Sequence, residues 1–164
     1  MGLLTWSNES SVGIQTIDNE HRELMDAINE LCDAVSHGHE REHTGMLLHR
    51  LIECARNHFS SEEAILLATS YPELEEHSRQ HQSLLEEVEE LAGRFFHDGL
   101  ILSGHSLTFL HYWFKDHLVN DDRLYTAWLQ CRGAAPACWQ PLSLTPACMR
   151  IEVLSCLIWP IPSS

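Results

Sequence analysis

Apolar residues recur every three or four positions along four long stretches of the chain, and charged residues fill the positions between them. In the first stretch, from Asp18 to about residue 35, the repeating positions are Leu24, Ile28, Leu31 and Val35. This spacing lines one side of an α-helix and predicts an amphipathic helix, with Asp18 as its N-cap.

Three further stretches show the same period, at about residues 42–67, 74–95 and 107–128. Glycines and prolines between them, including Gly38 and Pro72, mark short connections. No strand-like alternation of useful length occurs before residue 130. Four long helices with short connections predict an all-α, antiparallel up-down-up-down four-helix bundle over residues 1–130, which begins with an N-terminal arm.

The character of the sequence changes at Cys131. Residues 131–164 contain five prolines, four cysteines and one acidic residue, Glu152. Their apolar stretch near residues 151–161 is well short of the roughly 20 residues that a membrane span needs. We expect residues 131–164 to form an irregular C-terminal tail outside the bundle, of unknown role and without a membrane span.

The net charge argues against nucleic-acid binding, and the cysteine spacing argues against zinc and redox motifs. The net charge is −14, with a single lysine, and such a surface repels phosphate backbones, so nucleic acid is not expected as a partner. None of the six cysteines falls in C-x-x-C spacing, and residues 1–12 do not read as a signal peptide. These features predict reduced thiols in a cytoplasmic protein, with Cys32 and Cys54 packed as small hydrophobic side chains.

Seven metal-binding side chains interrupt the apolar stripes: His21, His58, Glu62, His77, His81, His117 and Asp122. Burying an unpartnered polar group costs roughly 1–7 kcal/mol, so seven such groups in one core need something to bind. Residues four apart share a helix face, which pairs His58 with Glu62 and His77 with His81. Helical spacing from His117 selects Asp121 rather than Asp122.

The donor set indicates the metal. Imidazole suits iron, zinc and copper, whereas a carboxylate can bridge two metals with its two oxygens. Five histidines are too many for one ion that also keeps an open position, and structural zinc would usually involve cysteine. A pair of iron ions is therefore the preferred interpretation.

The same residues carry a family pattern. It runs from Trp6 through Gly13-Ile14-x-x-Ile17-Asp18-x-Glu20-His21, His58-Phe59-x-Ser61-Glu62-Glu63 and His77-x-x-x-His81 to Trp113-x-x-x-His117-Leu118-x-x-x-Asp122-x-x-Tyr125. Over about residues 3–130 the chain resembles hemerythrin, in particular the single-domain bacterial hemerythrins. The resemblance also implies a four-helix bundle.

The resemblance implies a division of the ligands. His77, His81 and His117 would bind one iron, and His21 and His58 the other. Glu62 and Asp122 would bridge the two irons together with an oxo or hydroxo group. The iron with two histidines would keep a vacant position for dioxygen.

The family register also assigns residues outside the ligand set. It favours Asp122 over Asp121, and it places an oxygen pocket at Ile17, Phe59, Trp113 and Leu118. Glu63 is expected to be exposed. The remaining histidines match no ligand position and are expected on the surface or in loops; they are His37, His39, His43, His49, His97, His105 and His111.

The expected function is reversible dioxygen binding for transport, storage or supply to an oxygen-using enzyme partner, without turnover of a substrate. The alternative is a module that senses oxygen or nitric oxide with the same di-iron site. Reduction of peroxide or nitric oxide by an enzyme comes third. We expect a monomer.

Overall fold

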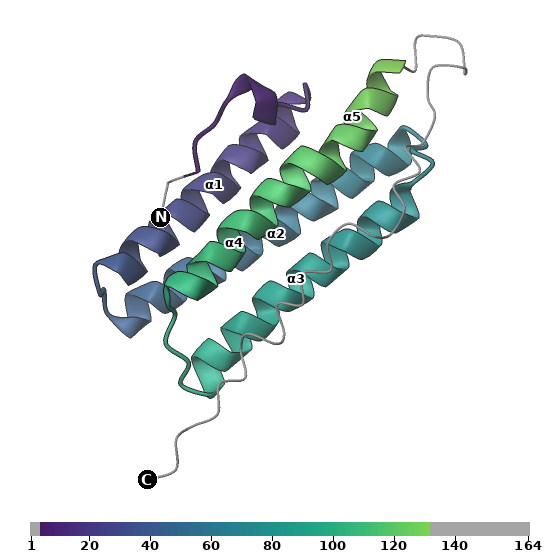
Figure 1. The fold of residues 1–164 in the computed structure, drawn as a ribbon. Helices are drawn as coiled ribbons and strands as arrows, with labels where there is room; N and C mark the ends of the chain where they lie inside the picture. The colour runs from purple at the N-terminus through teal and green to yellow at the C-terminus, as the bar shows by residue number, and fades with distance from the viewer. Residues whose placement is uncertain (1–3, 132–164) are drawn as a thin grey trace.

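Four helical rods lie side by side in the computed structural model, which describes residues 4–131 (Figure 1). The first three rods are α1 (Gln15–Ser36), α2 (Arg41–Ala68) and α3 (Leu74–His97). The fourth is continuous but composite, with α4 (Gly104–Asp116), a π-helical segment η2 (His117–Asp121) and α5 (Asp122–Cys131). A short 3-10 turn, η1 (Asn8–Ser10), precedes them. The all-α four-helix bundle predicted from periodicity is confirmed, and no strand occurs in residues 4–131.

The turn between α1 and α2 is fixed by backbone hydrogen bonds. The amide of His39 donates to the carbonyl of Ala34 at 2.9 Å, and the amide of Gly38 donates to that of Val35 at 3.2 Å. Gly38 has a φ of 66°. This pair of bonds around a left-handed residue is a Schellman motif, which glycine forms without steric cost.

The end of α2 repeats this motif without a glycine. The amides of Tyr71 and Ser70 donate to the carbonyls of Leu66 and Leu67 at 2.9 and 3.0 Å. Ser70 takes the left-handed position with a φ of 57°. A side chain at such a φ crowds the backbone, so this turn carries a strain that the first turn lacks.

The first helix begins earlier than its sequence predicts. It starts at Gln15, after an extended Ile14, and Asp18 lies inside the first turn. The predicted N-cap at Asp18 is therefore wrong. Its carboxylate accepts hydrogen bonds from the amide of Val12 at 2.8 Å and from the Ser11 hydroxyl at 2.6 Å. An acidic side chain still suits the positive end of the helix dipole, and here it also holds the arm.

The N-terminal arm is attached to the side of α1. The Asn29 amide group pairs with the backbone of Leu4 through two hydrogen bonds of 2.8 and 2.9 Å. Nearer the start of α1, the Arg22 guanidinium lies 3.8 Å from the ring centre of Trp6, a cation–π contact. The arm is thus part of the folded domain.

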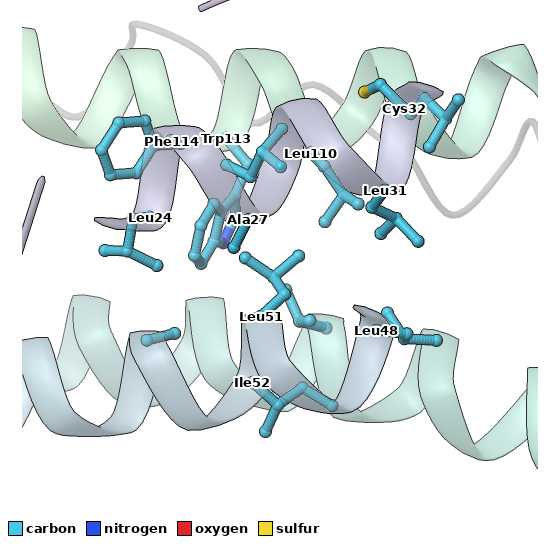
Figure 2. Close-up of a cluster of buried hydrophobic side chains, with 14 of the residues drawn as sticks. Leu24, Ala27, Leu31, Cys32, Leu48, Leu51, Ile52, Leu110, Trp113 and Phe114 are labelled. Atoms are coloured by element: carbon cyan, nitrogen blue, oxygen red, sulfur yellow. The ribbon is translucent and has the colours of Figure 1, made fainter. Parts of the chain in front are cut away.

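Two apolar clusters form the core. The larger one joins all four rods, and Figure 2 shows Leu24, Leu31, Leu51 and Leu110 from three of them directed into it. Cys32 belongs to this cluster, and both Cys32 and Cys54 are unpaired thiols whose pKa is raised by burial. The smaller cluster lies near the α2–α3 turn and consists of Val12, Ile17, Leu66, Tyr71 and Tyr125. Within residues 4–131, no helix has the length and apolar character needed to cross a membrane.

Candidate metal centre

The seven predicted ligands lie between the two apolar clusters, and every rod supplies at least one of them. They are His21 on α1, His58 and Glu62 on α2, His77 and His81 on α3, His117 in η2, and Asp122 at the start of α5. Each is at most 4% exposed. Helical spacing brings the predicted pairs onto one face, and the His77 and His81 ring centres are 4.3 Å apart.

The inward atoms of these side chains are close together. Glu62 Oε2 is 2.9 Å from His77 Nε2 and 3.0 Å from His81 Nε2. On the other side, Asp122 Oδ1 is 3.2 Å from His117 Nε2, and Asp122 Oδ2 is 3.2 Å from His21 Nε2. Both carboxylates therefore lie among the histidines rather than at the edge of the set.

The ligand atoms fall into two overlapping groups, each with its members within 4.8 Å of one another. One group is Glu62, His77, His81, His117 and Asp122, and the other is His21, His58, Glu62 and Asp122. The two groups share both carboxylates and no histidine. This is the donor arrangement that two ions bridged by two carboxylates require.

The π-helical segment explains why Asp122 is in this set. In an α-helix the residue on the same face as His117 is Asp121, four positions later. The wider turn of η2 (His117–Asp121) shifts the register by one residue. Asp122 is consequently 0% exposed and faces the histidines, whereas Asp121 is partly exposed.

A second layer of carboxylates lies outside the histidines. The outer Nδ1 of His81 is 2.8 Å from Glu63 Oε1, and that of His117 is 3.3 Å from Asp121 Oδ2. The outer Nδ1 of His58 is 3.5 Å from Glu20 Oε2. With a metal bound, such contacts would keep the ring proton on Nδ1 and leave the Nε2 lone pair directed inward as a ligand, which is the usual arrangement around protein metals.

Several buried atoms of the ligand set make no hydrogen bond of acceptable geometry among residues 4–131, even where another member of the set lies 3.2 Å away. They are both ring nitrogens of His21, Nε2 of His58, Oε1 of Glu62 and both carboxylate oxygens of Asp122. Buried lone pairs of this kind cost free energy unless something binds them. The residues present therefore fit a bound cation.

Electrostatics within the site support the same conclusion. Burial acts to raise the pKa of Glu62, but hydrogen bonds from His77 and His81 outweigh it and hold this pKa well below its ordinary value. Burial acts to lower the pKa of His117, but the Asp122 charge and the hydrogen bond to Asp121 raise it to about 9. In the metal-free chain, a proton on His117 thus balances part of the buried negative charge, and metal binding would displace it.

Three of the four predicted pocket residues belong to the larger apolar cluster. Phe59 stacks on His81 with ring centres 4.0 Å apart, and Trp113 lies 6.2 Å from Phe59. Leu118 is also buried in this cluster. Ile17 lies in the smaller cluster, one helical turn before His21. The predicted pocket residues therefore lie on two sides of the seven side chains: three in the larger cluster and Ile17 in the smaller one.

Comparison with known proteins identifies the family. The family model described as the hemerythrin HHE cation binding domain matches residues 12–129. The chain belongs to the hemerythrin family. It is 30% identical over 125 residues to the bacteriohemerythrin of Stenotrophomonas maltophilia, covering 76% of this chain and 80% of that protein. It is 31% identical over 127 residues to the bacteriohemerythrin of Clostridium acetobutylicum, covering 75% and 98%.

A solved structure agrees with this hemerythrin assignment. A crystal structure of wild-type hemerythrin matches with a TM-score of 0.72 at 25% identity, and the match covers 76% of this chain and 96% of that one. The resemblance inferred from the spaced motifs is therefore confirmed. The family match also supports a metal-binding, iron-type site in this hemerythrin-family chain.

The outer carboxylates are the residues that sequence reasoning missed. Glu63 was expected to be exposed, but its half-buried carboxylate binds the outer nitrogen of His81. A usable signal existed, because each outer carboxylate is the sequence neighbour of a predicted ligand in the hemerythrin pattern. These neighbours are Glu20 beside His21, Glu63 beside Glu62 and Asp121 beside Asp122.

Proposed function

We propose that this hemerythrin-family chain binds dioxygen reversibly at a non-haem di-iron centre and acts as an oxygen carrier, store or supplier to oxygen-using enzymes. The observation that carries the proposal is the pair of ligand groups that share Glu62 and Asp122 and no histidine. The proposed ligands are His21, His58, Glu62, His77, His81, His117 and Asp122.

The two ions would have unequal sets of protein ligands. His77, His81 and His117 would hold one ion, and His21 and His58 the other, with Glu62 and Asp122 shared. When bound, the two irons would supply reversible electron transfer to dioxygen. The shortage of one histidine on the His21 side is what leaves room for a small ligand.

The surrounding side chains would keep water away and hold the ligands in place. Phe59, Trp113 and Leu118 cover the site from the larger cluster, and Ile17 covers the His21 side. The outer carboxylates of Glu20, Glu63 and Asp121 would fix the orientation of three imidazoles. A dry and rigid pocket favours the release of intact dioxygen, because water and protons that would carry away reduced oxygen species as peroxide are kept out.

Iron stoichiometry and reversible colour change test the proposal. The reduced protein is prepared without oxygen, iron is counted per chain, and the absorption spectrum is followed through cycles of oxygen and argon. We expect two irons per chain and charge-transfer bands that appear with oxygen and vanish on its removal. His77→Ala should abolish the oxygen-dependent bands while the protein stays helical. His49→Ala, at an exposed position on α2, is the matched control and should behave as the wild type.

Each outcome has a defined meaning. Fewer than two irons per chain would contradict the di-iron centre itself. Two irons with fast, irreversible oxidation would contradict a carrier and favour the sensing module or an enzyme that reduces peroxide or nitric oxide. An unchanged oxygen response in His77→Ala would contradict the ligand assignment. The proposal also includes a monomer in the cytoplasm, to be checked by light scattering and by fractionation of cells.

A further inference from the structure

The two proposed ion positions share their carboxylates and differ in their histidines. Glu62 and Asp122 belong to both ligand groups. The three-histidine side adds His77, His81 and His117, and the two-histidine side adds His21 and His58. A difference in how firmly the two ions are held would therefore come from these imidazoles and from the side chains that support them.

On the three-histidine side, the inward nitrogens are already held together in the absence of metal. Nε2 of His77 and Nε2 of His81 lie 2.9 and 3.0 Å from the same oxygen of Glu62. Nε2 of His117 lies 3.2 Å from Nε2 of His81 and 3.2 Å from Oδ1 of Asp122. The ligand atoms of this side are therefore preorganised before an ion binds.

The outer support of the imidazoles is also stronger on the three-histidine side. Glu63 contacts Nδ1 of His81 at 2.8 Å, and Asp121 contacts Nδ1 of His117 at 3.3 Å. The Phe59 ring stacks on the His81 ring, with centres 4.0 Å apart and planes 14° apart. Loss of an outer partner typically weakens metal binding by about 10–100-fold, so these contacts favour retention of the ion.

The two-histidine side lacks comparable support. Nδ1 of His58 is 3.5 Å from Glu20, at the outer limit of a hydrogen bond. Nδ1 of His21 has no hydrogen-bond partner among residues 4–131. In this part of the chain, the buried ligand nitrogens without a hydrogen bond all belong to His21 and His58. The orientation of the His21 ring would therefore depend mainly on the ion itself.

We propose that the ion on the two-histidine side is released and exchanged first, an inference that rests on the proposed di-iron centre. The ion on the three-histidine side stays in place when the other leaves. Zinc suits imidazole donors as well as iron does, so zinc would replace iron at the weaker position alone. Such a mixed centre would stay folded and lack the second redox-active ion. Oxygen binding would then depend on which metal fills the position held by His21 and His58.

Release of cobalt to a chelator tests the proposal without oxygen chemistry. Cobalt(II) binds nitrogen and oxygen donors somewhat more tightly than iron(II), so it is a suitable probe of the same ligands. The full chain is treated with N-ethylmaleimide to block accessible thiols, loaded with cobalt under argon and mixed with excess EDTA. Cobalt left on the protein is measured at intervals after rapid gel filtration. Release is followed rather than uptake, because uptake on the three-histidine side must also displace the His117 proton.

We expect two phases of release, each of one cobalt ion per chain, with rates that differ by at least about 10-fold. His21→Ala should remove the fast phase and keep the slow one, whereas His81→Ala should remove the slow phase. His49→Ala, at an exposed position on α2, is the matched control and should keep both phases. Circular dichroism checks that each variant is folded. Zinc added to the cobalt-loaded wild type should yield chains with one cobalt and one zinc ion.

Glu63→Gln provides a test that removes no proposed ligand. It weakens the outer support of His81, so it should speed the slow phase by about 10-fold and leave the fast phase unchanged. A faster fast phase in this variant, or no change in either phase, would overturn the proposal even where a histidine variant fails to fold.

The outcomes separate this proposal from the di-metal centre on which it rests. Two cobalt ions released in a single phase would overturn the unequal positions and leave the di-metal centre intact. A slow phase that is lost in His21→Ala and kept in His81→Ala would overturn the order of release. Fewer than two bound cobalt ions per chain would contradict the di-metal centre itself, and the proposed exchange with it.

Discussion

Asp121 and Asp122 are identical neighbours in the sequence, yet the fold gives them different surroundings. Asp122 is fully buried among the histidines, and Asp121 touches the outer nitrogen of His117 from the partly exposed side. The two carboxylates therefore have different proposed roles. Asp122 would supply a donor atom to the metal, and Asp121 would orient the His117 ring that supplies another.

Amide substitution at the two positions should separate these tasks. Asp122→Asn removes one of the two proposed bridging carboxylates, so we expect at most about one iron per chain after gel filtration. Asp121→Asn keeps all seven donors, so we expect two irons per chain and a roughly 10-fold faster loss of iron to a chelator. Iron analysis and chelator competition measure both effects. Two tightly held irons in Asp122→Asn would contradict the assignment of Asp122 as a ligand.

At the scale of elements, most of the fold could be predicted and one irregularity could not. The apolar period fixed four helices and their connections, because a stripe of leucines records directly which face is buried. The apolar pattern gave no sign of η2. Apolar residues in a helix are spaced by three or four positions, and one extra residue in a single turn changes this spacing too little to be noticed. The register of Asp122 came from the family motif instead. The outer carboxylates were missed because polar residues at the edge of a buried face resemble ordinary surface residues.

Deletion of Val119 tests the role of the π-helical segment. Removing one residue from η2 should restore a regular α-helix in which Asp122 is four positions after His117 and stays on the same face. We therefore expect the deletion variant to keep its helical circular dichroism and both irons. Val119→Ala is the matched control and should bind iron normally. A folded deletion variant that loses its iron would contradict the view that η2 positions Asp122 by adding one residue to the turn.

The two Schellman turns offer a paired test of backbone strain. Ser70→Gly removes a side chain from a left-handed position and should stabilise the protein by roughly 0.5–1 kcal/mol. Gly38→Ser introduces the same strain and should destabilise it by a similar amount. A side chain at Gly38 would meet no atom within 4 Å, so a clash does not complicate the comparison. Urea unfolding of both variants measures the effect, and shifts of the same sign would contradict it.

At the scale of the whole molecule, contacts within residues 4–131 join the N-terminal arm to the four rods. Asp18 and Asn29 on α1 hold the arm, and both apolar clusters are built from residues up to Tyr125. The division of the chain at residue 130 stays a prediction. The prediction for residues 131–164 falls largely outside the described residues, since only Cys131 is placed, at the end of α5.

Truncation after Cys131 tests that division. Because residues 4–131 contain both apolar clusters and all seven proposed ligands, the shortened chain should fold and bind two irons per chain. We expect its melting temperature to stay within about 4 °C of the full chain, equivalent to about 1 kcal/mol. Calorimetry of the iron-loaded proteins and iron analysis provide the measurement. A truncated chain that aggregates or loses iron would assign residues 132–164 a structural role.

The distribution of the seven donors over all four rods has a kinetic consequence. The donors run from His21 near the start of the bundle to Asp122 near its end, so no helical hairpin contains a complete set for either ion. Metal can be held fully only after the last rod has docked, and its binding energy is then absent from the folding transition state. Iron should therefore leave the folding rate nearly unchanged and slow unfolding. Iron would bind after the bundle has formed and would slow its unfolding. The lifetime of the folded protein would therefore depend on the iron supply.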